Sequence, residues 1–172
     1  MKRWLVILPL AVLVALAALF VGYALKHDPK VQPDALVGRP APAVMLSPLD
    51  GGAPGPIRPA APGPYLVNFY ASWCGPCRIE HPALMALNAQ GVRVVGVAYK
   101  DRPAAARAFV EELGNPFITI LLDPDGRAGV EYGVSGVPET YAVGRDGRIL
   151  AKHTGPLTPD AAEALAARLD AR

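Results

Sequence analysis

The pentapeptide Trp73-Cys74-Gly75-Pro76-Cys77 constrains this chain most, because it contains both of its cysteines and directly follows an apolar run at residues 65–70. If a helix begins at Cys74, its backbone N–H groups and the positive end of its dipole favour a thiolate there. Cys77 would lie on the same first turn, where its thiol can resolve a mixed disulfide. Pro76 is tolerated because the first turn has no use for its missing N–H. The spacing predicts a redox-active pair at a strand–helix junction.

Other uses of two cysteines fit the sequence less well. A structural zinc site needs four nitrogen or sulfur ligands, and the chain offers only His27, His81 and His153 besides the cysteines. Covalent haem attachment would need a histidine after the second cysteine, and Arg78 stands there. An inert structural disulfide stays open at this point. We expect neither a bound metal nor a cofactor.

The N-terminal segment favours a membrane anchor. Lys2 and Arg3 precede residues 4–25, which carry no charge and would form a helix about 33 Å long, enough to cross a bilayer. A cleaved signal peptide is the alternative, because Gly22-Tyr23-Ala24 is an acceptable cleavage site, but secretory apolar cores are usually about 7–15 residues. We therefore expect an uncleaved, single-pass anchor. The basic leader predicts a cytoplasmic N-terminus, although Lys26 and Lys30 weaken the charge asymmetry.

Composition leaves one domain after the anchor. Lys2 and Arg3 account for the whole formal net charge of +2, so nothing favours a nucleic-acid partner. Ten prolines between Pro29 and Pro64 exclude a helix or central strand there. We expect an anchor at residues 1–25, a proline-containing tether at 26–39 and a globular domain at 40–172.

Periodicity within the domain predicts alternating strands and helices. We expect strands at 65–70, 92–97 and 117–122, helices at 74–88 and 103–113, a hairpin at 140–143 and 149–153, a last helix after Thr158, a short edge strand at 44–46 and a loop at 50–64. In the first helix the apolar face would include Ile79, Leu84, Met85 and Leu87, with a kink at Pro82. This order predicts an α/β fold with a mixed sheet covered on both faces.

Together with these motifs, the order of elements resembles the thioredoxin fold. The resemblance implies that the peptide bond between Val137 and Pro138 is cis and that this loop faces the cysteines. Such a proline leaves the preceding backbone free to pair with an extended substrate, so Val137 and Pro138 become candidate substrate-binding residues. Trp73, which lies beside the sulfurs in the resembling proteins, is expected to contact substrate; an ordinary half-buried aromatic is the alternative.

A closer similarity spans residues 36–157. The chain shares several strings in one order with one family: Cys77-Arg78-Ile79-Glu80-His81-Pro82, Tyr99-Lys100-Asp101, Leu113-Gly114-Asn115-Pro116, Asp125-Gly126-Arg127, Gly136-Val137-Pro138-Glu139-Thr140 and His153-Thr154-Gly155. It is similar to the CcmG/DsbE thiol:disulfide interchange proteins of cytochrome c maturation. These are membrane-anchored periplasmic thioredoxins, which implies an N-terminal transmembrane helix and location of the domain in the periplasm of a bacterium.

The chain departs from ordinary thioredoxin at Asn68, where the fold usually has a buried aspartate that assists the second cysteine. Asn68 cannot take up a proton, so Glu80 and Glu139 become the candidate carboxylates, which would oppose thiolate formation and accept a proton from Cys77. The alternative is that both glutamates are solvated surface residues and that Asn68 is a strand residue bonded to backbone. Gly75 and Pro76 are also expected to tune the reactivity of the cysteines. His81 and Tyr70 are expected to be packing or surface residues.

The resemblance implies a dithiol reductant. Its substrate would be the disulfide at the haem-attachment cysteines of apocytochrome c, opened directly or through another maturation protein, and a membrane thiol carrier of the DsbD or CcdA type would restore the dithiol. A general periplasmic thioredoxin of the TlpA or ResA type would differ only in partners. A disulfide-forming oxidase of the DsbA type usually carries a sizeable helical insertion and is disfavoured, because two strands and a helix occupy most of residues 78–136. A copper-binding assembly module remains open, since two thiolates can bind Cu(I).

Overall fold

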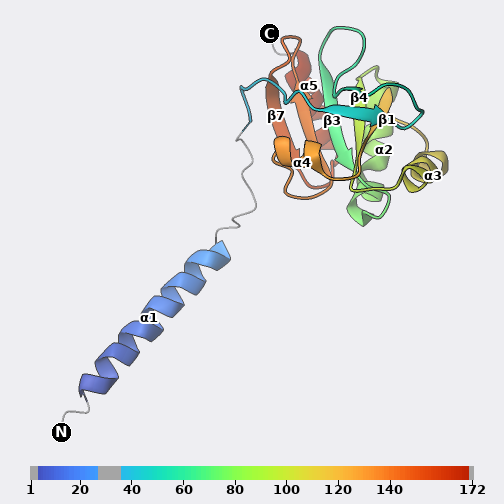
Figure 1. Cartoon of the computed structure of the whole chain (residues 1–172). Helices are drawn as coiled ribbons and strands as arrows, with labels where there is room; N and C mark the ends of the chain where they lie inside the picture. The colour runs from blue at the N-terminus through green and yellow to red at the C-terminus, as the bar shows by residue number, and fades with distance from the viewer. Residues whose placement is uncertain (1–3, 27–35, 171–172) are drawn as a thin grey trace. The chain divides into compact units, whose positions relative to one another are not determined.

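The computed structural model describes residues 4–26 and 36–170 (Figure 1). The chain divides into two compact units, Met1–Gln32 and Pro33–Arg172. The first contains helix α1, Trp4–Lys26. Over the residues that the structure describes, no helix combines the length and apolarity needed to cross a membrane, so the expected transmembrane helix is not shown. Most of the expected tether lies outside the described residues.

The second unit is built on a mixed sheet. Its strands are β1 (Met45–Pro48), β2 (Gly55–Pro56), β3 (Tyr65–Tyr70), β4 (Val94–Tyr99), β5 (Thr119–Asp123), β6 (Glu139–Val143) and β7 (Ile149–Thr154). Across the sheet they run in the order β2-β1-β5-β4-β3-β6-β7. Strands β3, β4 and β5 are parallel, and the remaining pairings are antiparallel. The predicted mixed sheet is confirmed.

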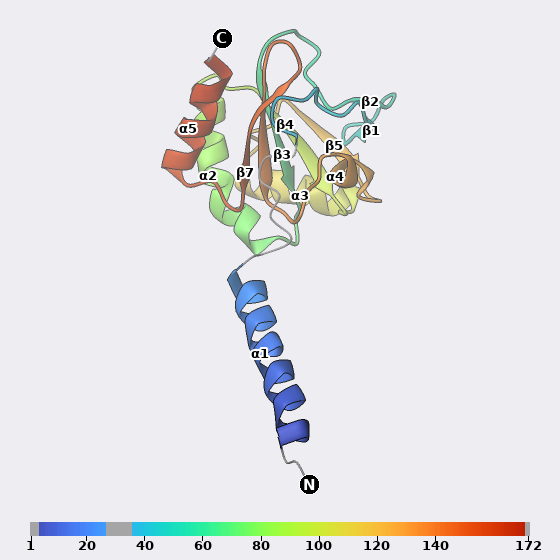
Figure 2. The same ribbon diagram turned by 90° about the vertical axis from the view of Figure 1, so that its left-hand side faces the viewer.

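Helices cover both faces of this sheet. They are α2 (Gly75–Ala89), α3 (Pro103–Leu113), α4 (Arg127–Glu131) and α5 (Pro159–Asp170). One core cluster joins Leu84 of α2, Phe109 of α3 and Leu165 of α5, whereas Ala128 of α4 belongs to the cluster on the opposite face. Figure 2 shows α2 and α5 side by side on one side of the sheet, where they contact each other.

Strand β3 occupies the centre of the sheet and positions the cysteines. All six of its residues are buried, as expected for a strand covered on both faces. Its side chains alternate, so that Leu66 and Tyr70 face the α2 side while Val67 and Phe69 face α4. The strand leads through a short turn into α2, as the sequence predicts.

Several predictions need correction. Ile79 is 73% exposed, not part of the apolar face of α2. The inward positions are taken by Cys77, Glu80, His81, Leu84 and Leu87, which recur at helical spacing and include two polar residues. The expected loop at 50–64 contains the short strand β2, the expected edge strand at 44–46 is β1 and lies between β2 and β5, and α4 was not predicted.

Candidate active site

The sulfur of Cys74 caps the helix that carries both cysteines. Cys74 has an extended backbone (φ −90°, ψ 109°) and is the N-cap of α2, and its Sγ accepts a hydrogen bond from the N–H of Cys77 at 3.1 Å. Cys74 and Cys77 form a disulfide, with Cα atoms 5.3 Å apart, and both are buried. Pro76 lies in the first turn. Gly75 is exposed, and a Cβ there would meet no other atom within 4 Å. The helix terminus and the Cys77 N–H both favour negative charge on Cys74 in the dithiol state.

The turn before the cysteines is held by the loop after β4. The Ser72 N–H and Oγ donate to the Asp101 carboxylate at 2.6 and 2.9 Å, and the Trp73 indole N–H donates to the Lys100 carbonyl at 3.2 Å. Sequence reasoning assigned no role to Lys100 and Asp101. Their position in the sequence could have indicated one. They follow a strand that is parallel to β3, and the carboxyl ends of neighbouring parallel strands lie at the same edge of the sheet. These residues position the active-site turn.

The indole of Trp73 lies at the surface of the site. The side chain is 61% exposed, so the alternative of a half-buried aromatic is wrong. Its exposed ring beside Cys74 is compatible with the predicted substrate contact, because a large rigid aromatic offers much apolar area. That role stays a prediction.

The Val137–Pro138 loop faces Cys74. The peptide bond is cis, as the resemblance implies. The Val137 carbonyl oxygen lies 3.5 Å from Cys74 Sγ, and the Pro138 carbonyl accepts a hydrogen bond from the Gly155 N–H at 3.0 Å. The expected proximity of this loop to the cysteines is therefore confirmed, and substrate binding by Val137 and Pro138 stays a prediction.

Glu80 is a fully buried carboxyl group one helical turn after Cys77. Its Oε1 accepts from Asn68 Nδ2 at 2.8 Å, and its Oε2 accepts from the Leu157 N–H at 2.9 Å. Burial raises the pKa of Glu80 to about 7, although both hydrogen bonds act in the opposite direction. The surface alternative for Glu80 is wrong, since its side chain has no exposed area. A carboxyl group with this pKa can exchange protons at neutral pH on the helix face that it shares with Cys77.

Asn68 bonds to side chains rather than to backbone. Besides Glu80, its Nδ2 donates to Thr140 Oγ1 at 3.0 Å. Thr140 lies directly opposite Asn68 in the β3–β6 ladder, so both side chains project to the same face. Sequence reasoning missed Thr140, because its pairing with Asn68 depends on the register of distant strands. At the strand position where ordinary thioredoxins have an aspartate, this chain therefore has an amide that donates a hydrogen bond to Glu80.

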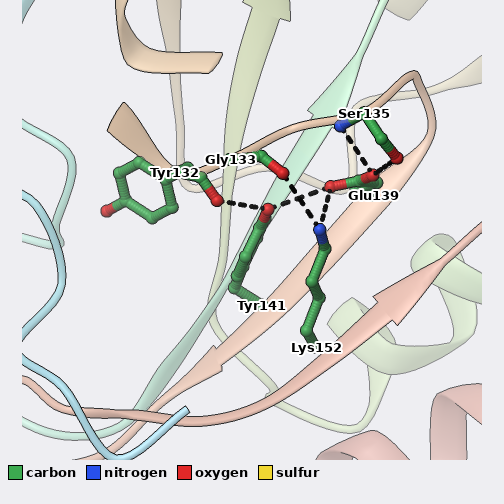
Figure 3. A network of polar contacts seen from close by, with 6 residues as sticks. All are labelled: Tyr132, Gly133, Ser135, Glu139, Tyr141 and Lys152. Carbon is green, nitrogen blue, oxygen red and sulfur yellow. Dashed lines mark hydrogen bonds and ion pairs between the residues drawn. The ribbon is translucent and has the colours of Figure 1, made fainter. Parts of the chain in front are cut away.

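Glu139 lies on the opposite face of the sheet from the cysteines, contrary to prediction. It precedes Thr140 on β6, and successive strand residues point to opposite faces. Its carboxylate contacts Ser135, Tyr141 and Lys152 (Figure 3). The surface alternative is also wrong, because Glu139 is fully buried. Its contacts give it no proton path to Cys77.

His81 and Tyr70 are packing residues. His81 Nε2 lies 2.9 Å from the Gly114 carbonyl oxygen, its ring packs edge-on against Phe109, and burial lowers its pKa. Tyr70 stacks on Phe117. Over residues 4–26 and 36–170, no three His, Cys, Asp or Glu side chains are grouped so as to hold a metal ion.

Comparison with known proteins agrees with this geometry. The Redoxin family model matches residues 36–167. The chain is 43% identical over 161 residues to the thiol:disulfide interchange protein HelX of Rhodobacter capsulatus, covering 93% of this chain and 92% of HelX. It is 40% identical over 167 residues to the thiol:disulfide interchange protein DsbE of Escherichia coli, covering 92% and 89% of the two chains.

Solved structures show the same fold. A secreted disulfide oxidoreductase of Mycobacterium tuberculosis, described as homologous to Escherichia coli DsbE, superposes with a TM-score of 0.61 at 26% identity, over 76% of this chain and 96% of that one. StoA of Bacillus subtilis gives a TM-score of 0.56 at 26% identity, over 74% and 98%. The chain therefore belongs to the Redoxin family and is a thiol:disulfide oxidoreductase of the DsbE and HelX type.

Proposed function

We propose that this protein is a periplasmic dithiol reductant that serves cytochrome c maturation. The Cys74 thiolate attacks one sulfur of a substrate disulfide, which forms a mixed disulfide and releases the other substrate sulfur as a thiolate that takes up a proton. Cys77 then loses its proton and attacks Cys74 Sγ, which releases the second substrate thiol. Two electrons pass to the substrate, and the protein is left with the Cys74–Cys77 disulfide.

The buried Glu80 carboxyl group is the observation that best supports reduction. Cys77 must lose a proton before it can attack, and Glu80 follows it by one helical turn with a pKa of about 7. A carboxylate at this site accepts that proton and passes it on after the substrate leaves. The negative form of Glu80 also opposes a stable thiolate at Cys77, which keeps the pair reactive towards a disulfide.

The proposed substrate is the disulfide between the haem-attachment cysteines of apocytochrome c, reached directly or through another maturation protein. The shared strings with the CcmG/DsbE proteins support this choice, as does similarity along nearly the whole of HelX and DsbE. A membrane thiol carrier of the DsbD or CcdA type would supply electrons to the oxidised protein. A general reductant of the TlpA or ResA type would use the same chemistry on more substrates.

We also propose that residues 1–25 anchor the chain in the bacterial inner membrane, with residues 26–39 as a tether and residues 40–172 in the periplasm. The absence of charge from residue 4 to residue 25, behind Lys2 and Arg3, supports the anchor and its orientation. The periplasm is also a compartment in which substrate disulfides form.

A trapping experiment tests the substrate. In a Cys77→Ser variant, the mixed disulfide at Cys74 cannot be resolved, so substrates should accumulate on the protein in cells and be identified by mass spectrometry. A Cys74→Ser variant is the matched control and should capture nothing through this site. Apocytochromes c, or proteins that handle them, are the expected captures. A broad set of envelope proteins would instead indicate a general reductant, and an empty trap would contradict reduction itself.

A further inference from the structure

A polar network lies on the face of the sheet turned away from α2, behind the loop that faces Cys74. Glu139 and Tyr141 project to this face from β6, and Lys152 stands directly opposite Tyr141 on β7. Figure 3 shows these side chains converging on the chain at Gly133 and Ser135. None of these contacts involves a cysteine, so the reaction described above does not use this network.

The centre of the network is a buried ion pair. Lys152 Nζ lies 2.8 Å from Glu139 Oε2, and the two side chains are only 7% and 0% exposed. The Tyr141 hydroxyl lies 2.9 Å from the same Oε2 and 2.8 Å from the Tyr132 carbonyl oxygen. Each charge thus depends on its partner, because a buried charge without one is strongly unfavourable.

The network fastens the segment that leads into the cis-proline, residues 133–137. Lys152 Nζ donates to the Gly133 carbonyl at 3.2 Å, and Glu139 Oε1 accepts from both the N–H and the hydroxyl of Ser135. Ser135 and Gly136 are themselves exposed, so little apolar burial holds them. Val134 and Val137, on either side of these two residues, are partly buried against the core. Ser135 and Gly136 therefore depend most on polar contacts for a fixed position, and Glu139 supplies such contacts just before Val137.

We propose that the Glu139–Lys152 pair positions residues 133–137 as a docking edge for the polypeptide around a substrate disulfide, with Lys152 as the main positioning residue. The inference rests on the proposed reductase function and adds a determinant of substrate selection to it. The Val137 carbonyl lies 3.5 Å from Cys74 Sγ, so a shift of this segment moves the edge on which an extended chain would pair. A small disulfide with no flanking peptide makes no use of that edge.

The test compares two disulfides in the full-length, reduced protein. One is a short extended peptide with a Cys-x-x-Cys disulfide, and the other is hydroxyethyl disulfide. Lys152→Met keeps the aliphatic stem and removes the ammonium group. We expect it to lower the second-order rate constant for the peptide by about tenfold or more, because misplacing a docking edge costs preorganisation. The rate constant for hydroxyethyl disulfide should change by less than about twofold, since the cysteines are untouched. Lys152→Arg should restore most of the peptide rate.

Two further variants keep the inference falsifiable. Ser135→Ala removes one partly buried hydroxyl contact and leaves the ion pair intact, so it should fold and lower only the peptide rate, by about threefold. Arg107→Met is the matched control, because Arg107 also joins a carboxylate, Asp50, to a carbonyl, Leu49, but outside the proposed docking edge. It should change neither rate.

An equal fall of both rates in Lys152→Met, or an unchanged ratio in Ser135→Ala, would overturn the inference. If Lys152→Met does not fold, the ratio of the two rate constants in Ser135→Ala alone tests the inference. Failure of the proposed function would appear in the wild-type protein instead, as no measurable reduction of either disulfide.

Discussion

Glu80 combines complete burial with two hydrogen bonds that favour its charged form, and burial has the larger effect on its pKa. In the thioredoxin fold, a buried aspartate on the strand usually assists the second cysteine. Here Asn68 holds that position and donates to Glu80 on the helix. The buried carboxyl group thus lies on the helix rather than on the strand, and the strand residue is its hydrogen-bond donor.

Stability should consequently depend on pH through Glu80. Its pKa is about 7 in the folded protein against 4.5 ordinarily, so the folded state binds an extra proton between these pH values. The contribution of Glu80 to the free energy of unfolding should therefore be largest below pH 4.5. It should fall by about 3 kcal/mol as pH rises from there through 7. Glu80→Gln should abolish this fall, measured by urea denaturation of the disulfide form.

One other titratable group and one control variant bear on this comparison. His81 has a lowered pKa, so it contributes stability that is lost as pH falls below 6.5, but it does so in both proteins and cancels in their difference. Glu112→Gln is the control variant. It removes an exposed glutamate whose pKa is lowered by Arg78, so it should change the pH dependence of stability only below pH 4.5. If wild type and Glu80→Gln show the same slope between these limits, the assignment of Glu80 is wrong.

Among the elements, the loop between β4 and α3 supports the active-site turn through Asp101. Asp101 is buried, and its carboxylate accepts both bonds from Ser72 as well as the Arg102 N–H. Asp101→Asn places an amide group where one of the acceptors stood. It should lower the free energy of unfolding by about 2 kcal/mol, because hydrogen bonds to a buried charged group are among the stronger ones.

The control is Asp50→Asn, which weakens an exposed ion pair with Arg107. Exposed pairs contribute little, so this change should stay within about 0.5 kcal/mol. Equal effects of the two substitutions in urea denaturation would show that the hydrogen bonds of Asp101 stabilise the fold no more than an exposed ion pair does.

Periodicity explains which elements were predictable. Strand β3 is a compact apolar run and α3 an apolar stripe that Gly114 ends, and both match their predicted ranges. Helix α4 has only five residues, too few for a repeat, and β2 has two. Ile79 was misplaced because Glu80 and His81 occupy the inward face, which only their tertiary partners reveal. The face of Glu139 likewise depends on the pairing of β6 with β3.

At the scale of the whole molecule, the two units allow a direct test of the anchor. A chain that begins at Pro33 retains the complete second unit. It should unfold at the same urea concentration as the full-length protein and reduce a soluble peptide disulfide equally fast. After cell fractionation it should be soluble, whereas the full-length chain should stay with the membranes until detergent is added. A soluble full-length chain would rule out the anchor.

The two faces of the central sheet carry different polar groups. Thr140 faces the cysteine helix and the Asn68–Glu80 pair, while its neighbour Glu139 faces Lys152 and the loop beyond. Because adjacent residues of one strand serve opposite sides, reducing power and partner choice can be inherited, or redesigned, as separate traits. A protein engineer could exchange residues 133–136 together with Lys152 to redirect the enzyme to another substrate, and keep Val137 and the cysteines as they are.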